Sequence, residues 1–65
     1  MPIIRVEMFE GRSVEQKRRL ARELTDTVAR VIECDPATVR VLFNEYATDD
    51  WAIGGTLRSD SPKPR

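Results

Sequence analysis

The stretch PIIRVEMFEGRSVEQ, residues 2–16, decides the fold of this chain, because it holds a strand, a break and the start of a helix. Within residues 2–9 the side chains alternate between the two faces of an extended backbone, with Ile4, Val6 and Met8 on the same face. An apolar period of two residues is typical of a β-strand that buries one face. We therefore predict a first strand over residues 2–9.

The end of the same stretch opens a helix. Ser13 and Gln16 form an S-x-x-Q capping box, in which each side chain accepts a hydrogen bond from the other residue's backbone N–H. One helix face is then apolar: Leu20, Leu24, Val28, Val31 and Ile32. The opposite face carries charged pairs typical of a solvated surface: Glu15 with Arg19 and Arg19 with Glu23. Because Pro36 cannot continue a helix, we predict that the helix stops within residues 34–36.

A second strand and a hairpin follow the helix. Residues 39–46 are rich in β-branched and aromatic side chains, which favour a strand. The order strand, helix, strand predicts a right-handed crossover with parallel strands. Gly54-Gly55, within residues 47–58, is a turn signal and predicts a short hairpin. We expect one domain over residues 1–65, with a mobile tail at 59–65 that has nothing to pack against.

These elements are too few to bury a stable core. A chain of 65 residues buries only about 60% of the surface that its unfolded form exposes. Small domains usually need disulfides, a metal or partner chains. The single cysteine, Cys34, cannot form an internal disulfide, and without histidine the chain offers no cluster with zinc-type ligand spacing. A two-stranded sheet also leaves exposed edges, so oligomerisation is the expected source of stability.

The charge composition excludes some classes of partner. The chain has 11 basic and 11 acidic residues and a net charge of zero, which argues against a dedicated binder of nucleic acids or anionic membranes. Nine of the basic residues are arginine, the side chain suited to bidentate capture of a carboxylate or a phosphate. The sequence shows no signal peptide and no long apolar span. We expect a cytoplasmic protein, which fits the unpaired thiol.

The N-terminus is the candidate for acid–base chemistry. Without histidine, the usual proton carrier at neutral pH is absent. Pro2 follows the initiator Met1, and removal of Met1 would leave a secondary amine. An α-amino group has a pKa of about 7.7–8.0, which burial or a nearby cation lowers, so such an amine could accept a proton. The alternative is that Pro2 only begins an edge strand, where its missing N–H does no harm.

Four segments of the chain carry a resemblance to a known family. They are Pro2-Ile3-Ile4-Arg5-Val6, Glu10-Gly11-Arg12-Ser13-x-Glu15-Gln16-Lys17, Val39-Arg40-Val41 and Trp51-Ala52-Ile53-Gly54-Gly55. At this spacing they resemble the 4-oxalocrotonate tautomerases (2-hydroxymuconate tautomerases), from residue 2 to about residue 57. The resemblance implies an α/β (α+β) protomer of the tautomerase, MIF-like fold. Such a protomer is one β-α-β unit with parallel strands and a short C-terminal hairpin, its sheet joined to another across a dimer. Short family members are typically hexamers, built as trimers of dimers.

The resemblance also implies a set of site residues. Pro2 would be the general base, Arg12 would hold the distal carboxylate of the substrate, and Arg40 would engage its 2-oxo group and adjacent carboxylate. Trp51 falls where the family usually has Phe and would form an aromatic wall, with Phe9 as a further candidate for the pocket lining. In family hexamers the arginines and the aromatic residue come from subunits next to the one that supplies Pro2. No cofactor and no metal are expected.

Several of these residues have a structural alternative. Arg12 could pair with Glu10 or Glu15 at the junction between strand and helix. Trp51 could belong to an interface core, and strand packing explains Phe9 equally well. These alternatives remain open at the level of the sequence.

We therefore predict an isomerase that converts 2-hydroxymuconate, or a similar dienol dicarboxylate, into its conjugated 2-oxo acid, as in aromatic hydrocarbon catabolism. Phe9 and Ile53 occupy places where dehalogenase-type relatives carry an arginine and a carboxylate, which argues against hydrolytic dehalogenation. Trp51 and Ala52 replace the family's usual Phe and Gly, which leaves open a different, biosynthetic enol substrate. A non-catalytic oligomer that binds anions is the third possibility, and retention of Met1 would favour it.

Overall fold

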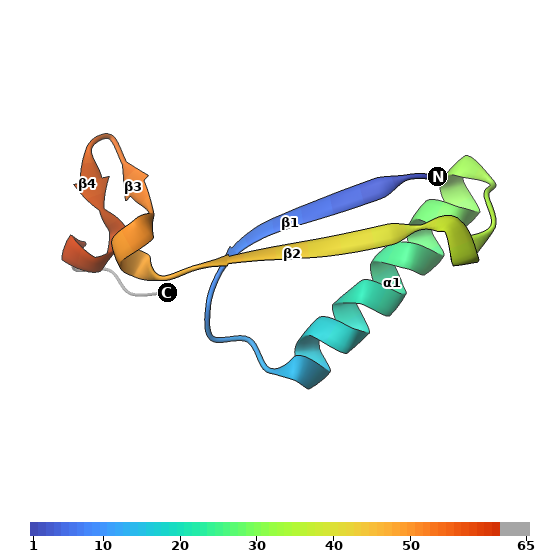
Figure 1. Ribbon diagram of the computed structural model, residues 1–65, viewed down its shortest axis with the longest axis horizontal. Helices are drawn as coiled ribbons and strands as arrows, with labels where there is room; N and C mark the ends of the chain where they lie inside the picture. The colour runs from blue at the N-terminus through green and yellow to red at the C-terminus, as the bar shows by residue number, and fades with distance from the viewer. Residues whose placement is uncertain (62–65) are drawn as a thin grey trace.

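The computed structural model describes residues 1–61, which form two long strands and one helix, followed by a small hairpin (Figure 1). The elements are β1 (Ile3–Phe9), α1 (Val14–Ile32), β2 (Arg40–Tyr46), β3 (Ala52–Ile53) and β4 (Thr56–Leu57). Short 3-10 turns lie between and after them: η1 (Pro36–Thr38), η2 (Thr48–Asp50) and η3 (Arg58–Asp60). The predicted β-α-β protomer with a short C-terminal hairpin is confirmed.

The strands β1 and β2 form a parallel ladder, as predicted. Its register runs from the pair Ile3 and Arg40 at one end to the pair Phe9 and Tyr46 at the other. The two strands have seven residues each and pair along their whole length. Side chains of paired residues therefore share a face of the sheet, so the register fixes which parts of β1 and β2 meet.

Each strand begins one residue later than predicted. Pro2 has no N–H to give to the ladder, although its carbonyl accepts a hydrogen bond from the Arg40 N–H at 3.0 Å. The Val39 N–H donates to the Pro36 carbonyl at 3.1 Å and so closes η1. The first strand starts late because Pro2 lacks an N–H, and the second starts late because the Val39 N–H is used in η1.

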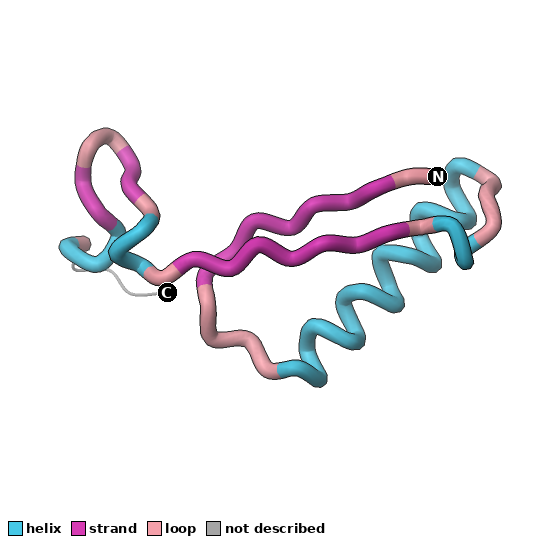
Figure 2. The backbone as a smooth tube through the Cα atoms, in the orientation of Figure 1, coloured by secondary structure: helices cyan, strands magenta, loops and turns pink. Residues whose placement is uncertain are grey.

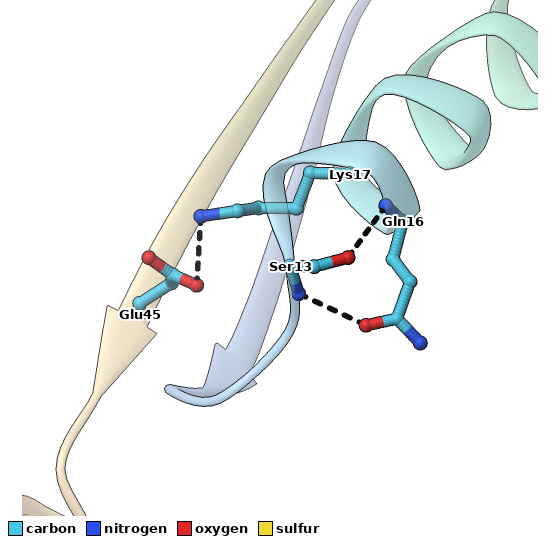
Figure 3. Close-up of polar contacts among 4 residues, drawn as sticks. All are labelled: Ser13, Gln16, Lys17 and Glu45. Carbon is cyan, nitrogen blue, oxygen red and sulfur yellow. Dashed lines mark hydrogen bonds and ion pairs between the residues drawn. The ribbon is translucent and has the colours of Figure 1, made fainter.

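The helix α1 begins at the predicted capping box. Ser13 Oγ accepts a hydrogen bond from the Gln16 N–H at 3.1 Å, and Gln16 Oε1 accepts one from the Ser13 N–H at 2.9 Å (Figure 3). Glu33 ends the helix in the left-handed conformation, with φ of 57°. Near its start the helix is joined to β2, because Lys17 Nζ lies 3.0 Å from a carboxylate oxygen of Glu45 (Figure 3).

The outer face of α1 carries ion pairs, but one of them differs from the prediction. The pair of Arg19 and Glu23 is confirmed, with Nε and Oε2 2.6 Å apart. The predicted pair of Glu15 with Arg19 is wrong, because Glu15 binds Arg18 instead. Residues three and four apart are both neighbours on a helix surface, so Glu15 had two arginines within reach.

The helix covers one face of the sheet and leaves the other face open (Figures 1 and 2). On the covered side Ile4, Val6 and Met8 of β1 are half-buried, as the alternation predicted. Val41 and Phe43 of β2 are half-buried beside them. The open face carries the remaining side chains of both strands: Ile3, Arg5, Glu7, Phe9, Arg40, Leu42, Asn44 and Tyr46.

The protomer has no core of its own. No residue among the 61 described is fully buried, and large apolar side chains such as Val31 and Ile53 are more than 60% exposed. The radius of gyration is 15.0 Å, whereas a compact domain of this length would have one of about 11 Å. Figure 2 shows why: the hairpin stands beyond the end of the sheet and does not fold back onto it.

The predicted hairpin follows η2. Ala52 pairs with Leu57 and Ile53 with Thr56, around a turn in which Gly54-Gly55 has φ of 60° and 86°. Positive φ at both central residues is what a type I′ hairpin turn requires. Of the tail expected over residues 59–65, the first two residues belong to η3, and 62–65 lie outside the described residues. Within the described range, no helix is both long and apolar enough to cross a membrane.

Candidate active site

Pro2 and Arg40 lie side by side where the ladder begins. The Arg40 N–H donates to the Pro2 carbonyl at 3.0 Å, which holds the two backbones together. Pro2 is half-buried, while the Arg40 side chain is exposed and its Nη1 donates to the Thr38 carbonyl at 3.2 Å. Met1 precedes Pro2, so the proline nitrogen is an amide until Met1 is removed.

The aromatic candidates gather at the opposite end of the ladder. The ring centroids of Phe9 and Trp51 are 4.5 Å apart at an angle of 51°. Tyr46, which pairs with Phe9 in the ladder, meets Trp51 edge to face at 5.6 Å and 77°. Tilted and edge-to-face arrangements are the favourable ones for aromatic pairs. Trp51 is half-buried through these contacts, although the hairpin that follows it is exposed.

Arg12 lies at this same end of the ladder. It is exposed and lines a cavity of about 280 Å³ together with Phe9, Glu10 and residues of η2 and η3. Within residues 1–61 no ion pair joins Arg12 to Glu10 or Glu15, and Glu15 binds Arg18. The two structural alternatives for Arg12 therefore do not describe this conformation, and its guanidinium is available to an anion.

The predicted site residues thus fall into two separate groups in one protomer. Pro2 and Arg40 lie where β1 begins, whereas Phe9, its last residue, lies with Arg12 and Trp51 at the other end. A strand of seven residues is about 23 Å long at about 3.3 Å per residue. One chain therefore does not bring the proline within reach of Arg12 and Trp51. No group of three or more His, Cys, Asp or Glu side chains in the described range could hold a metal ion.

A polar cluster that no sequence pattern indicated lies on the open face of the sheet. Tyr46 Oη donates to Glu7 Oε1 at 2.5 Å, and Asn44 Nδ2 donates to both Glu7 oxygens at 3.3 and 3.4 Å. These donors, with a smaller contribution from the charge of Arg5, lower the pKa of Glu7 below its ordinary value. The same bond to a carboxylate raises the pKa of Tyr46. The cluster forms because the ladder register places Glu7 opposite Asn44, and the sequence alone does not indicate this register.

Arg58 is a second residue near these candidates that no sequence motif indicated. Arg58 lines the same cavity as Arg12. Its N–H donates to the Trp51 carbonyl at 2.7 Å, so the hairpin returns the chain to the aromatic cluster. Only the fold of the hairpin shows this proximity, because Arg58 and Arg12 are far apart in the sequence.

Comparisons with known proteins agree with this architecture. The family model described as tautomerase enzyme matches residues 2–61. The 2-hydroxymuconate tautomerase of Pseudomonas putida is 41% identical over 59 residues, which cover 91% of this chain and 94% of that protein.

Solved structures of similar length share the fold. A 4-oxalocrotonate tautomerase homologue superposes with a TM-score of 0.87 at 40% identity, covering 97% of this chain and 100% of the other. A heterohexameric 4-oxalocrotonate tautomerase from Chloroflexus aurantiacus superposes with a TM-score of 0.85 at 37% identity, covering 92% and 97%. The chain therefore belongs to the tautomerase family of enzymes and is close to the 2-hydroxymuconate and 4-oxalocrotonate tautomerases.

Proposed function

We propose that this protein is a cofactor-free keto–enol tautomerase that converts 2-hydroxymuconate, or a similar dienol dicarboxylate, into the conjugated 2-oxo acid. Membership of the tautomerase family supports the reaction class, and the similarity to a 2-hydroxymuconate tautomerase supports the substrate class. The exposed guanidinium groups of Arg12 and Arg40 suit an acid at each end of the substrate.

The proposed base is the secondary amine of Pro2 after removal of Met1. It takes the proton of the dienol hydroxyl, and the electrons of that O–H bond form the 2-oxo group while the double bonds shift along the chain. The protonated amine then returns a proton to a carbon further along the conjugated system. The amine is regenerated, so atoms and charge balance without a further reactant.

Each arginine has a distinct part in this proposal. Arg40 engages the 2-oxo group and the carboxylate beside it, and its cation stabilises the negative charge that develops on the oxygen. Arg12 holds the distal carboxylate. Trp51 and Phe9 form an apolar wall that excludes water and favours the neutral form of the amine.

The observation that carries the proposal is the division of these residues between the two ends of a protomer without a core. We propose that copies of this chain assemble as a homo-oligomer, a hexamer by analogy with the Chloroflexus relative, so that the Pro2 end of one copy meets the Trp51 end of another. Assembly would then cover the exposed apolar faces and complete the site.

The test is the ketonisation of 2-hydroxymuconate, followed by ultraviolet absorbance, with protein whose intact mass shows that Met1 is absent. We expect kcat/KM of about 10⁵ M⁻¹s⁻¹ or higher, within the ordinary range of enzymes. Pro2→Ala replaces the rigid secondary amine by a primary amine that turns freely, and it should lose most of its kcat with the oligomer intact.

The comparison is the same chain with Met1 retained, in which the proline nitrogen is an amide without basicity. Equal rates for the Met1-retained and processed proteins would overturn the role of Pro2. Absence of turnover in the processed protein would overturn the substrate assignment.

A different enol substrate is the second candidate, and the cluster of Phe9, Tyr46 and Trp51 favours it. Three contacting rings present a broad aromatic surface, which suits a flat or aryl-bearing enol. Assay of phenylenolpyruvate beside 2-hydroxymuconate separates the two candidates. A higher kcat/KM for the aryl substrate would favour the second one.

A further inference from the structure

We propose that Arg58 is a second cationic residue of the substrate site, which acts with Arg12 on the distal carboxylate and makes the site selective for dicarboxylates. The inference rests on the proposed function for the position of the substrate, and it assigns to that site a residue outside the four segments that resemble the family. Three observations carry it: the cavity, the anchoring of Arg58 and the balance of charge.

The cavity at the end of β1 joins segments that are distant in the sequence. Phe9 and Arg12 enter it from the end of β1 and the loop after it, Thr48 from η2, and Arg58 from η3. Its volume is about 280 Å³, enough for the end of a small dicarboxylate. Phe9 provides an apolar surface in the cavity and contacts Trp51 on the sheet's open side.

Arg58 is anchored at this cavity through its backbone. Its N–H donates to the Trp51 carbonyl at 2.7 Å, and its carbonyl accepts from the Ser61 N–H at 3.1 Å, which closes η3. Arg58 is half-buried, unlike the exposed arginines of α1. The position of this arginine is therefore coupled to Trp51, the residue proposed to form the wall of the pocket.

The charges around the cavity favour an anion. Among the described residues that line it, two are arginines, Arg12 and Arg58, and one, Glu10, is acidic. A guanidinium group carries forked donors that match the geometry of a carboxylate. The hydroxyl of Thr48 adds a neutral donor. A second carboxylate on the substrate therefore finds a cationic lining here, whereas a methyl group in its place gains nothing from it.

The test compares two probes that differ only at that end. Muconate is a conjugated dicarboxylate, and sorbate has the same carbon chain with one carboxylate replaced by methyl. Neither has the enol hydroxyl, so binding is measured without turnover. The chain has a single tryptophan, and quenching of its fluorescence reports occupancy beside Arg58. The assembled protein without Met1 is titrated with each probe.

We expect Arg58→Ala to weaken muconate binding about 10-fold, which corresponds to about 1.4 kcal/mol, and to leave sorbate binding within about twofold. Arg30→Ala, which removes an exposed arginine of α1 away from the cavity, should change neither. Arg58→Gln is made in parallel, because it keeps a polar side chain in η3 and should show the same loss of selectivity for muconate.

Equal weakening of both probes in Arg58→Gln, or unchanged muconate binding, would overturn the role of Arg58. The outcome is distinct from that of the proposed function. Muconate binding that depends on Arg58, in a protein that does not convert 2-hydroxymuconate, would sustain this inference and overturn the substrate assignment. Turnover of 2-hydroxymuconate that is unaffected by Arg58→Gln would overturn this inference and sustain the substrate assignment.

Discussion

The bond between Glu7 and Tyr46 connects the open face of the sheet to the aromatic cluster. Tyr46 donates to Glu7 at 2.5 Å and contacts the Trp51 ring with its edge. A carboxylate that accepts hydrogen bonds is favoured in its charged form, which accounts for the lowered pKa of Glu7. The bond therefore holds the tyrosine ring against Trp51 as long as Glu7 is ionised and Tyr46 is protonated.

The expected consequence is a stability that depends on pH. Because the pKa of Glu7 is lowered in the folded state, its contribution is present above the ordinary value of 4.5 and is lost as the pH falls through the folded value. Tyr46→Phe keeps the ring but removes the donor, so it should be less stable than the wild type near neutral pH and converge with it in acid. Denaturant melts at a fixed protein concentration across acidic and neutral pH measure this difference.

Glu7→Gln is the control for this prediction, since it keeps an acceptor for the tyrosine hydroxyl but does not ionise. A gap between wild type and Tyr46→Phe that persists unchanged into acid would show that the charge of Glu7 has no part in it.

At the scale of the elements, local sequence patterns predicted the strands, the start of the helix and the hairpin turn. The alternation in residues 2–9 and the capping box at Ser13 gave the right elements within a residue, because strand faces and helix starts depend on near neighbours. The turn at Gly54-Gly55 was also predicted from the sequence, because glycine adopts positive φ without steric strain. The predicted ion pair of Glu15 with Arg19 was wrong, because Arg18 is equally near to Glu15 on the helix surface.

The capping box makes a quantitative prediction for α1. Ser13→Ala removes the acceptor of the Gln16 N–H, a bond of 3.1 Å, and should lower the free energy of unfolding by about 1 kcal/mol. The Ser13 N–H also loses its reciprocal partner if Gln16 swings away. Thermal or denaturant unfolding measures the change.

Thr27→Ala is the matched control, since Thr27 lies exposed in the middle of α1, away from both caps. Alanine has a slightly higher helix propensity than threonine, so this variant should be neutral or stabilised by a few tenths of a kcal/mol. An equal loss in both variants would mean that the cap has no specific role.

At the scale of the whole molecule, local patterns were less informative. The sequence predicted that one chain could not bury a core, and the described residues confirm it. It did not predict that Arg58 and Arg12 line one cavity, or that Glu7 meets Tyr46. These contacts depend on the ladder register and on the position of the hairpin, which no periodicity in the sequence encodes.

The missing core predicts that stability depends on protein concentration. If partner chains provide the burial, dilution favours unfolding and the Tm rises with concentration. Leu42, 46% exposed on the open face of the sheet, is expected to contribute to that burial. Leu42→Asp should therefore reduce the assembly to smaller, less stable species in analytical ultracentrifugation.

Arg22→Asp provides the control, because it introduces the same side chain at an exposed position of α1. We expect it to assemble like the wild type. A Tm independent of concentration, or an intact oligomer in Leu42→Asp, would mean that the open face of the sheet stays exposed to solvent.

The separation of Pro2 and Trp51 at the two ends of the protomer also predicts how different mutant copies behave when they assemble together. If each site takes Pro2 from one chain and Trp51 from another, a copy with a damaged proline and a copy with a damaged aromatic end are not equivalent losses. Mixed in equal amounts and associating at random, such copies would leave about a quarter of the sites with both an intact proline and an intact aromatic end. Two inactive alleles in the same cell would then restore partial activity to each other, a form of intragenic complementation that follows from the length of β1.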